Sequence, residues 1–461
     1  ATFVTGRRYA EPTLGRTLTY GRTEDQPFPC QVVMDEGRKR ALVIGLLTNA
    51  VSDLVVEFTG RRRGAGQELR MDSARLFRGQ PALLVRNGAV AAGETIYLGA
   101  AATADITEAV TEYKALLRKA IPERTDIQRK RPFKNGRFWG SWNMGLYRNI
   151  SHELILNQAR IIARTRPDLK WIQVDDGYNV ATKPGLFLLE PPGIDRKKFP
   201  RGMRAFTDDI RQLGLRPALW MGLIINPDYP IPHFAKDWLA LKTDGTPMRI
   251  VPDGNHFLDF SLAPVREYFE KVIRTVIRDW GFAGIKFDFW SDHFYCNDLR
   301  YRNPNFTGAM LRDWFWKTIR KYLGPDGFTL TGCCIGNGNP FHGRYIDAFR
   351  CGIDIGHGTD LQGQIHSAFW YGMLAKFKVS DHFLTDIDSM GDISTIVNER
   401  VHRMWNSFAG ICGGNLEYAG LLDRQHPVWG AKAAAAFNWV PLGRMGQPLD
   451  FPVPLQNRLA P

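Results

Sequence analysis

From about residue 138 to residue 415, short apolar runs alternate with longer segments that carry apolar residues at helical spacing. The strand-like runs are Phe138–Trp142, Trp171–Val174, Arg216–Met221, Gly284–Phe289, Thr329–Cys333, Tyr345–Arg350, Val379–Leu384 and Gly410–Gly414. The helix-like segments are Glu153–Arg164, Ala205–Leu213, Val265–Trp280 and Met310–Tyr322. This alternation is typical of a parallel α/β sheet, and eight strands over this length predict a (β/α)8 TIM barrel. The additional run Phe257–Phe260 is interpreted as part of an excursion between barrel strands.

The chain before the barrel has a different pattern. Short apolar runs separated by turn residues predict strands at Val43–Thr48, Leu54–Thr59, Ala82–Val85 and Thr95–Gly99, followed by a helix over Asp105–Lys119. We therefore expect a smaller, β-rich, sandwich-like domain over residues 1–120 that ends in a linker helix, and a linker over residues 121–135. The barrel then occupies residues 136–425, and a proline-rich irregular tail occupies residues 426–461.

Composition excludes several classes of function. The formal charge is +13, from 60 Lys and Arg against 47 Asp and Glu, but the basic runs Arg61–Arg63, Arg129–Arg131 and Arg196–Lys198 are short and scattered, so no nucleic-acid partner is expected. No apolar stretch is long enough to span a membrane. The six cysteines lack CxxC spacing, and no ligand cluster indicates a metal or an organic cofactor. The oligomeric state, including a homo-oligomer, and the compartment are left open.

Carboxylates close several of the predicted strands. Asp175 and Asp176 follow one strand, Asp288 closes another, and Asp354, Asp386 and Asp388 stand in or after later ones. Acids gathered at the carboxyl ends of successive strands are the expected layout of a barrel active site. Lys286 lies two residues before Asp288, so both side chains point to the same face of the strand. A structural Lys–Asp ion pair is the alternative interpretation of that segment.

These strand ends resemble those of the α-galactosidase clan of glycoside hydrolases. The likeness is greatest to family 36, the melibiase-like enzymes, and more distant to family 27, and it covers about residues 138–415. The segments that carry it are Asp175–Tyr178, Leu219–Met221, Lys286–Asp288, Gly332–Cys333, Arg350–Asp354 and Asp386–Asp388. Each motif is weak by itself, but the six stand in the order in which the family has them.

The resemblance implies a retaining double displacement, with Asp288 as the nucleophile and Asp354 as the general acid/base. It also implies sugar ligands: Asp175 and Asp176 for the O4 and O6 hydroxyls, Lys286 for O3 or O4, Cys333 near O2, Trp220 along the sugar face, and Arg350 as a further substrate-binding residue. Trp139, Trp142, Trp290, Asp386 and Asp388 are additional candidates, for which core packing, helix capping or support of other side chains are the alternatives. Whether Arg350 reaches Asp354 is left open.

The sequence therefore favours a retaining exo-α-glycosidase, an α-galactosidase first, whose partner is an oligosaccharide or glycoside. Three alternatives stay open. A relative of the same clan would act on another α-linked sugar, such as N-acetylgalactosamine, or transfer the sugar to an acceptor other than water. A barrel aldolase would use Lys286 as a Schiff-base lysine. The third alternative is a sugar-binding barrel without activity.

Overall fold

The structure is a computed structural model of the 461-residue chain. It describes residues 2–3, 17–19, 30–35, 40–48, 53–63, 66–77, 96–102, 106–121, 137–142, 146–180, 193–223, 236–250, 255–289, 294, 299–332, 339–350, 384–391, 399–412, 414–424, 428 and 431.

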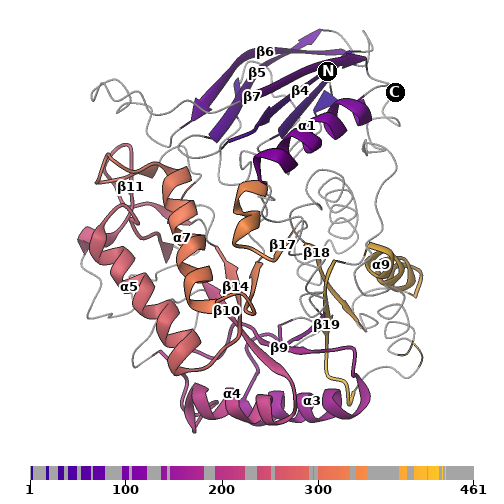
Figure 1. The fold of residues 1–461 in the computed structure, drawn as a ribbon, viewed down its shortest axis with the longest axis vertical. Helices are drawn as coiled ribbons and strands as arrows, with labels where there is room; N and C mark the ends of the chain where they lie inside the picture. The colour runs from indigo at the N-terminus through magenta and orange to yellow at the C-terminus, as the bar shows by residue number, and fades with distance from the viewer. Residues whose placement is uncertain are drawn as a thin grey trace.

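Eight parallel strands form a closed barrel in the lower part of Figure 1. Each strand pairs with the next barrel strand along the chain, and the last one, β19, pairs with the first, β8. The barrel strands are β8 (Arg137–Gly140), β9 (Trp171–Val174), β10 (Arg216–Gly222), β14 (Gly284–Asp288), β16 (Phe328–Thr331), β17 (Ala348–Arg350), β18 (Leu384–Gly391) and β19 (Asn415–Ala419). The predicted (β/α)8 barrel is confirmed.

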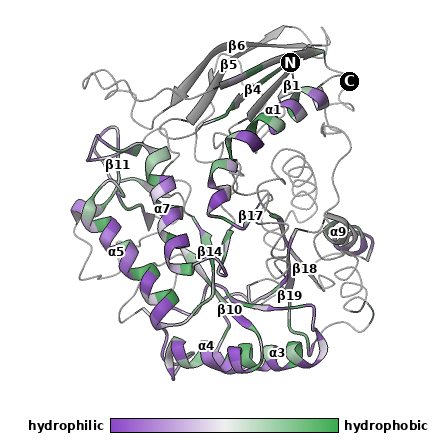
Figure 2. Ribbon diagram, viewed as in Figure 1, coloured by the Kyte–Doolittle hydropathy of each residue, from purple (hydrophilic) through white to green (hydrophobic). Residues whose placement is uncertain are grey.

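Helices flank the barrel on its outside (Figure 1). They are α3 (His152–Thr165), α4 (Gly202–Gln212), α5 (Ala263–Arg274) with its π-helical extension Thr275–Asp279, α7 (Gly308–Leu323), the 3-10 helix η5 (Pro340–Arg344) and α9 (Glu399–Cys412). Figure 2 shows both hydrophobic and hydrophilic residues along α3, α4, α5 and α7, as expected where one face packs on a barrel. Ser151 and Thr307 cap α3 and α7, because their hydroxyls accept backbone N–H groups of the first turn.

The first six predicted barrel strands overlap the observed ones, but the last two are misplaced. Of the predicted Val379–Leu384, only Leu384 belongs to β18, and residues 379–383 lie outside the described part. The segment Gly410–Cys412 is the end of α9, and the strand begins later, at Asn415. A short apolar run is compatible with a buried helix turn or a strand, so periodicity alone did not separate the two.

An excursion separates β10 from β14, as predicted. It holds η3 (Lys236–Trp238), β11 (Leu241–Lys242), β12 (Arg249–Ile250) and β13 (Asn255–His256), and β15 (Leu299–Arg300) pairs with β11. The apolar run at residues 257–260 belongs to this excursion, since Leu258 forms an isolated bridge with Leu239 and no barrel strand includes it.

Antiparallel sheets precede the barrel. One has the order β1-β3-β4-β7 and the other β2-β5-β6. Their strands are β1 (Thr2–Phe3), β2 (Thr17–Thr19), β3 (Cys30–Asp35), β4 (Arg40–Leu46), β5 (Asp53–Arg63), β6 (Gly66–Phe77) and β7 (Ile96–Ala102). The expected strand at residues 82–85 lies outside the described part. The β-rich start is confirmed, whereas the domain limits stay a prediction.

Helix α1 (Ile106–Ala120) packs against the first of these sheets. The hydroxyl of Tyr113 donates to the backbone oxygen of Leu46 at 2.8 Å. Gly45 makes room for that ring, because a Cβ atom there would lie 2.2 Å from it. In Figure 1 this helix lies between the sheets and the barrel.

Candidate active site

Every second residue of a barrel strand points into the barrel. Along the strands of this barrel, these inward residues change from apolar to polar. Near the amino ends these residues form one apolar cluster, made of Phe138, Trp171, Ala218, Phe328, Leu330, Ala348 and Leu384. Two residues further along β9, β17 and β18 the inward positions are polar, at Gln173, Arg350 and Asp386, and β14 contributes Lys286 to the same polar layer. The alternation within each strand thus builds an apolar floor beneath a polar layer at the carboxyl ends.

Asp288 closes β14 with a carboxyl group that is fixed at both oxygens. Its Oδ2 accepts a hydrogen bond from Nε1 of Trp220 at 3.0 Å, and its Oδ1 accepts one from the backbone N–H of Phe289 at 2.9 Å. Phe289 adopts a left-handed backbone with a φ of 49°, which is strained for an aromatic residue. Gly332 lies beside the carboxyl, and a Cβ atom there would come within 2.6 Å of Asp288 Cγ. The backbone at Phe289 and Gly332 therefore adapts to the position of the Asp288 carboxyl group.

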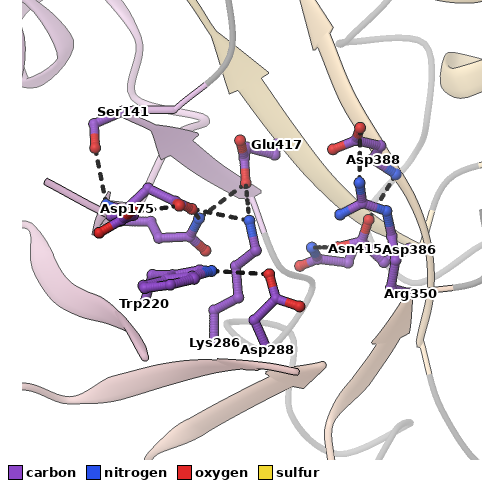
Figure 3. A network of polar contacts seen from close by, with 12 residues as sticks. Ser141, Asp175, Trp220, Lys286, Asp288, Arg350, Asp386, Asp388, Asn415 and Glu417 are labelled. Atoms are coloured by element: carbon purple, nitrogen blue, oxygen red, sulfur yellow. Dashed lines mark hydrogen bonds and ion pairs between the residues drawn. The ribbon is translucent and has the colours of Figure 1, made fainter. Parts of the chain in front are cut away.

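The side chain of Lys286 on β14 extends past the neighbouring strand β10 to the end of β9. Its Nζ donates to Oδ2 of Asp175 at 2.9 Å, and both side chains are buried (Figure 3). The partner of Lys286 is thus the acid at the end of β9, rather than its neighbour Asp288. Burial opposes the charge of the ammonium, but the carboxylates of Asp175 and Glu417 outweigh it and raise the pKa of Lys286 well above its usual value. Lys286 is therefore a cation at neutral pH.

Asp175 and Asp176 are both buried at the end of β9. The Oδ1 atom of Asp176 accepts from the backbone N–H of Gly177 at 2.7 Å and lies 3.7 Å from a guanidinium nitrogen of Arg148, while its Oδ2 has no hydrogen-bond partner. Burial raises the pKa of Asp176 to about 6, with Arg148 lowering it and Asp175 raising it to smaller extents. An acceptor oxygen without a partner inside a polar layer is available to a ligand hydroxyl.

Arg350 belongs to a second group of polar side chains, next to the first in Figure 3. Its guanidinium pairs with Oδ2 of Asp388 at 2.7 Å. Asp386 accepts from the backbone N–H of Asp388 at 2.7 Å and from the side-chain amide of Asn415. Asp388 has a positive φ of 83°, so its backbone is held in a conformation that non-glycine residues rarely adopt. Asp388 thus holds the guanidinium of Arg350, and Asp386 holds the backbone of Asp388.

Three of the predicted site residues, Cys333, Trp290 and Asp354, lie outside the described residues. Trp139 is a core residue and no wall of the site. It is fully buried in the main core, and its Nε1 donates to the backbone oxygen of Gly420 at 2.9 Å. The reason is the strand alternation, which points Trp139 away from the barrel interior. Trp142 follows β8, is partly exposed and packs edge-on against Tyr147.

Sequence reasoning missed Gln173, Asn415 and Glu417, all of which are buried in the polar layer. Gln173 stands in a predicted strand and could have been found as the inward residue two positions before Asp175. Asn415 and Glu417 alternate with apolar residues in β19, so the period-two signal exists there as well. It was overlooked because the last strand was placed too early in the chain.

Within the described part of the chain, no group of three or more His, Cys, Asp or Glu side chains could hold a metal ion. None of the described helices is long and apolar enough to cross a membrane. The polar layer offers fixed carboxyl groups, the ammonium of Lys286 and the guanidinium of Arg350, which suit a ligand with many hydroxyl groups.

Solved structures that resemble this chain include several α-galactosidases. TtGalA, the α-galactosidase of Thermus thermophilus solved with p-nitrophenyl α-D-galactopyranoside, has a TM-score of 0.65 at 18% identity, over 95% of this chain and 85% of that chain. The family 36 α-galactosidase AgaA of Geobacillus stearothermophilus has a TM-score of 0.60 at 13% identity, over 94% of this chain and 58% of that chain. The α-galactosidase of Lactobacillus brevis has a TM-score of 0.58 at 12% identity, over 94% and 56%.

No family model matches the sequence, and no curated protein matches it. At these identities the structural likeness establishes the fold. The chain spans less than two thirds of the length of the Geobacillus and Lactobacillus enzymes.

Proposed function

We propose that this protein is a retaining exo-α-glycosidase that hydrolyses terminal α-linked galactose. The observation that carries the proposal is the fixed carboxyl group of Asp288 at the carboxyl end of β14, in the polar layer where Lys286 meets Asp175. Barrel enzymes carry out their chemistry at this end. The resemblance of six strand-end motifs to family 36, and the fold that the chain has in common with α-galactosidases, support the same conclusion.

In the proposed mechanism Asp288 attacks the anomeric carbon and Asp354 protonates the leaving oxygen. The bond between the sugar and the aglycone breaks, and a covalent glycosyl-Asp288 ester forms. Water, deprotonated by Asp354, then cleaves the ester and releases the sugar with its original configuration. Trp220 holds Asp288 in place for the attack by its hydrogen bond to Oδ2.

Asp175, Asp176 and Lys286 would bind the sugar hydroxyls. The free Oδ2 atom of Asp176 is the acceptor for one of them, and Lys286 is the donor. Among the related structures, TtGalA was also solved with stachyose, so an oligosaccharide is the substrate class we propose. Arg350, held by Asp388, is proposed as a further substrate-binding residue.

The aldolase alternative loses support from the charge of Lys286. A Schiff-base lysine attacks a carbonyl as the neutral amine, which requires a lowered pKa. The carboxylates around Lys286 raise its pKa instead. The ammonium is therefore suited to hydrogen bonding with a sugar and unsuited to nucleophilic attack.

The proposal is tested by kcat/KM on nitrophenyl α-galactoside, α-glucoside, N-acetyl-α-galactosaminide and β-galactoside, with the anomer first released identified by proton NMR. We expect a preference for the α-galactoside and release of α-galactose. Acceptors to sugar hydroxyls contribute about 1.5–3 kcal/mol each, so Asp175→Asn and Asp176→Asn should each reduce the galactose-to-glucose ratio roughly tenfold or more.

The matched control is Asp168→Asn, which removes an acid paired with Arg166 outside the barrel interior and should leave the ratio unchanged. If the wild type preferred glucose, or if neither mutation changed the galactose-to-glucose ratio of kcat/KM, the protein would be an α-glycosidase of another specificity. Release of β-galactose would refute the retaining mechanism.

A further inference from the structure

Glu417 is a buried acid in the barrel interior that the proposed mechanism does not use. It is the third residue of β19 and is 3% exposed. Its Oε2 accepts a hydrogen bond from Nε2 of Gln173 at 3.0 Å and lies 3.9 Å from Nζ of Lys286. Figure 3 shows its carboxyl group next to the end of the Lys286 side chain. Glu417 therefore takes part in the same polar layer as the proposed sugar ligands.

Two donors that reach Glu417 also reach Asp175. Nε2 of Gln173 donates to Oδ2 of Asp175 at 3.0 Å, and Nζ of Lys286 donates to the same oxygen at 2.9 Å. One amide and one ammonium thus bridge two carboxyl groups. The bridge connects strands that are far apart in the sequence, since 244 residues separate Gln173 from Glu417.

The barrel wall leaves space for Glu417. Gly140 on the neighbouring strand β8 has no side chain, and a Cβ atom there would lie 2.2 Å from Oε1 of Glu417. A buried charge is costly unless it is compensated, and an apolar side chain of similar size would stabilise the barrel at least as well. A glycine that makes room for an acid, and a glutamine that binds it, indicate that this carboxyl group serves the site rather than the fold.

We propose that Glu417 is a positioning residue that holds the ammonium of Lys286 in place beneath the sugar while Asp175 turns to the substrate. The proposal deepens the proposed function and rests on it as far as the ligand is a sugar. Asp175 is shared between Lys286 and the ligand, because the same carboxyl group is the proposed acceptor of sugar hydroxyls. Glu417 lies two residues before the end of its strand, and in this proposal it keeps its contact with Lys286 when the ligand is bound.

The electrostatics agree with this role. Burial raises the pKa of Glu417, and Lys286 and Arg350 act against that effect while Asp175 and Asp386 add to it. These four groups face Glu417 from β14, β17, the end of β9 and β18. Glu417 in turn is one of the two carboxylates that raise the pKa of Lys286. Removing its charge should therefore weaken both the orientation and the protonation of the ammonium.

The test is a double-mutant cycle with Glu417→Gln and Lys286→Met. If Glu417 acts through Lys286, Glu417→Gln should raise KM for the nitrophenyl α-galactoside, and the Kd of galactose measured by calorimetry, by about tenfold with a smaller change in kcat. In the Lys286→Met background the same substitution should change both constants less than about twofold, because coupled residues are not additive. Glu270→Gln, which alters a surface acid bound by Lys321, is the matched control.

A second measurement does not depend on the substrate. The NMR signal of the Lys286 ε-carbon, assigned by its loss in Lys286→Met, reports the charge of the ammonium. Because the Glu417 carboxylate raises the pKa of Lys286, Glu417→Gln should lower the pH at which this signal titrates. If Glu417→Gln does not fold, Gln173→Met removes the bridging amide at similar volume and should raise KM in the same way.

The outcomes separate this inference from the proposed function. A wild type that neither cleaves nor binds galactosides would refute the proposed function, and the titration of Lys286 would still decide the role of Glu417. An active wild type whose KM, Kd and Lys286 titration are all unchanged by Glu417→Gln would refute the positioning role. An equal effect of the substitution with and without Lys286 would show that Glu417 acts by another route.

Discussion

The indole Nε1 of Trp220 donates a hydrogen bond to Oδ2 of Asp288 at 3.0 Å. The two residues lie on adjacent barrel strands, where Trp220 is in register with Lys286, two positions before Asp288. The resemblance of the sequence to family 36 implied that Trp220 lies along the sugar face. The contact supports a more specific proposal for the indole, that its Nε1–H group orients the carboxyl group of Asp288.

Trp220→Phe tests this contact, because it removes the donor and keeps an aromatic ring. A hydrogen bond to a charged group contributes about 1.5–3 kcal/mol, so kcat/KM should fall by roughly ten- to a hundredfold if the bond persists in the transition state. The control is Trp238→Phe in the excursion, which should leave kcat/KM unchanged. If Trp220→Phe had the kcat/KM of the wild type, the hydrogen bond from Trp220 would not contribute to catalysis.

Asp288→Ala should abolish turnover of every substrate, because the covalent intermediate cannot form. We expect a loss of several orders of magnitude in kcat/KM, as is usual when a nucleophile is removed. Added azide should restore part of the cleavage and give a β-glycosyl azide, which mass spectrometry and NMR identify. If Asp288→Ala kept activity within about tenfold of the wild type, another residue would be the nucleophile.

Asp354→Ala should affect poor leaving groups far more than activated ones. An aglycone that leaves readily needs no proton, so the loss on dinitrophenyl galactoside should be much smaller than on melibiose. The alkaline limb of the pH dependence of kcat/KM should also flatten. Equal losses on both substrates would point to a different general acid, with Asp386 and Asp388 as the next candidates.

Asp176 should destabilise the fold at neutral pH. Its pKa rises from 3.8 in the unfolded chain to about 6 in the folded one, so the unfolded chain releases this proton first. Stability therefore falls as the pH rises from about 4 to about 6, by an amount on the order of 3 kcal/mol. Asp176→Asn should melt at a higher temperature than the wild type near pH 8, with little difference near pH 4.

Asp168 provides the control of opposite sign. Burial acts against its charge, but the hydrogen bonds and the charge of Arg166 outweigh burial and lower the pKa of Asp168. Its stabilising contribution is present above the unfolded pKa and is lost as the pH falls. Asp168→Asn should therefore lower the melting temperature near neutral pH and have little effect in acid. If both variants responded to pH alike, the burial of Asp176 would not be the cause.

Local patterns were sufficient for the architecture and for the position of several acids at strand ends. Apolar runs separated by amphipathic segments gave the barrel and its first six strands, because the periods of helix and strand are properties of consecutive residues. The strand-end acids Asp175, Asp176 and Asp288 were found for the same reason. The last strand was missed by a few residues, and Glu417 was missed with it.

Contacts across the barrel were decided only by the tertiary structure. The sequence placed Lys286 and Asp288 on one face and suggested an ion pair, but closure of the barrel brings Lys286 to Asp175, 111 residues away, and to Glu417. Trp139 was an additional candidate for the site, and whether its side chain points into or out of the barrel depended on the position of the strand in the barrel. The chain by itself determines which residues alternate along each strand, whereas the register between distant strands determines which of them meet, since that register is set by the packing of the whole barrel.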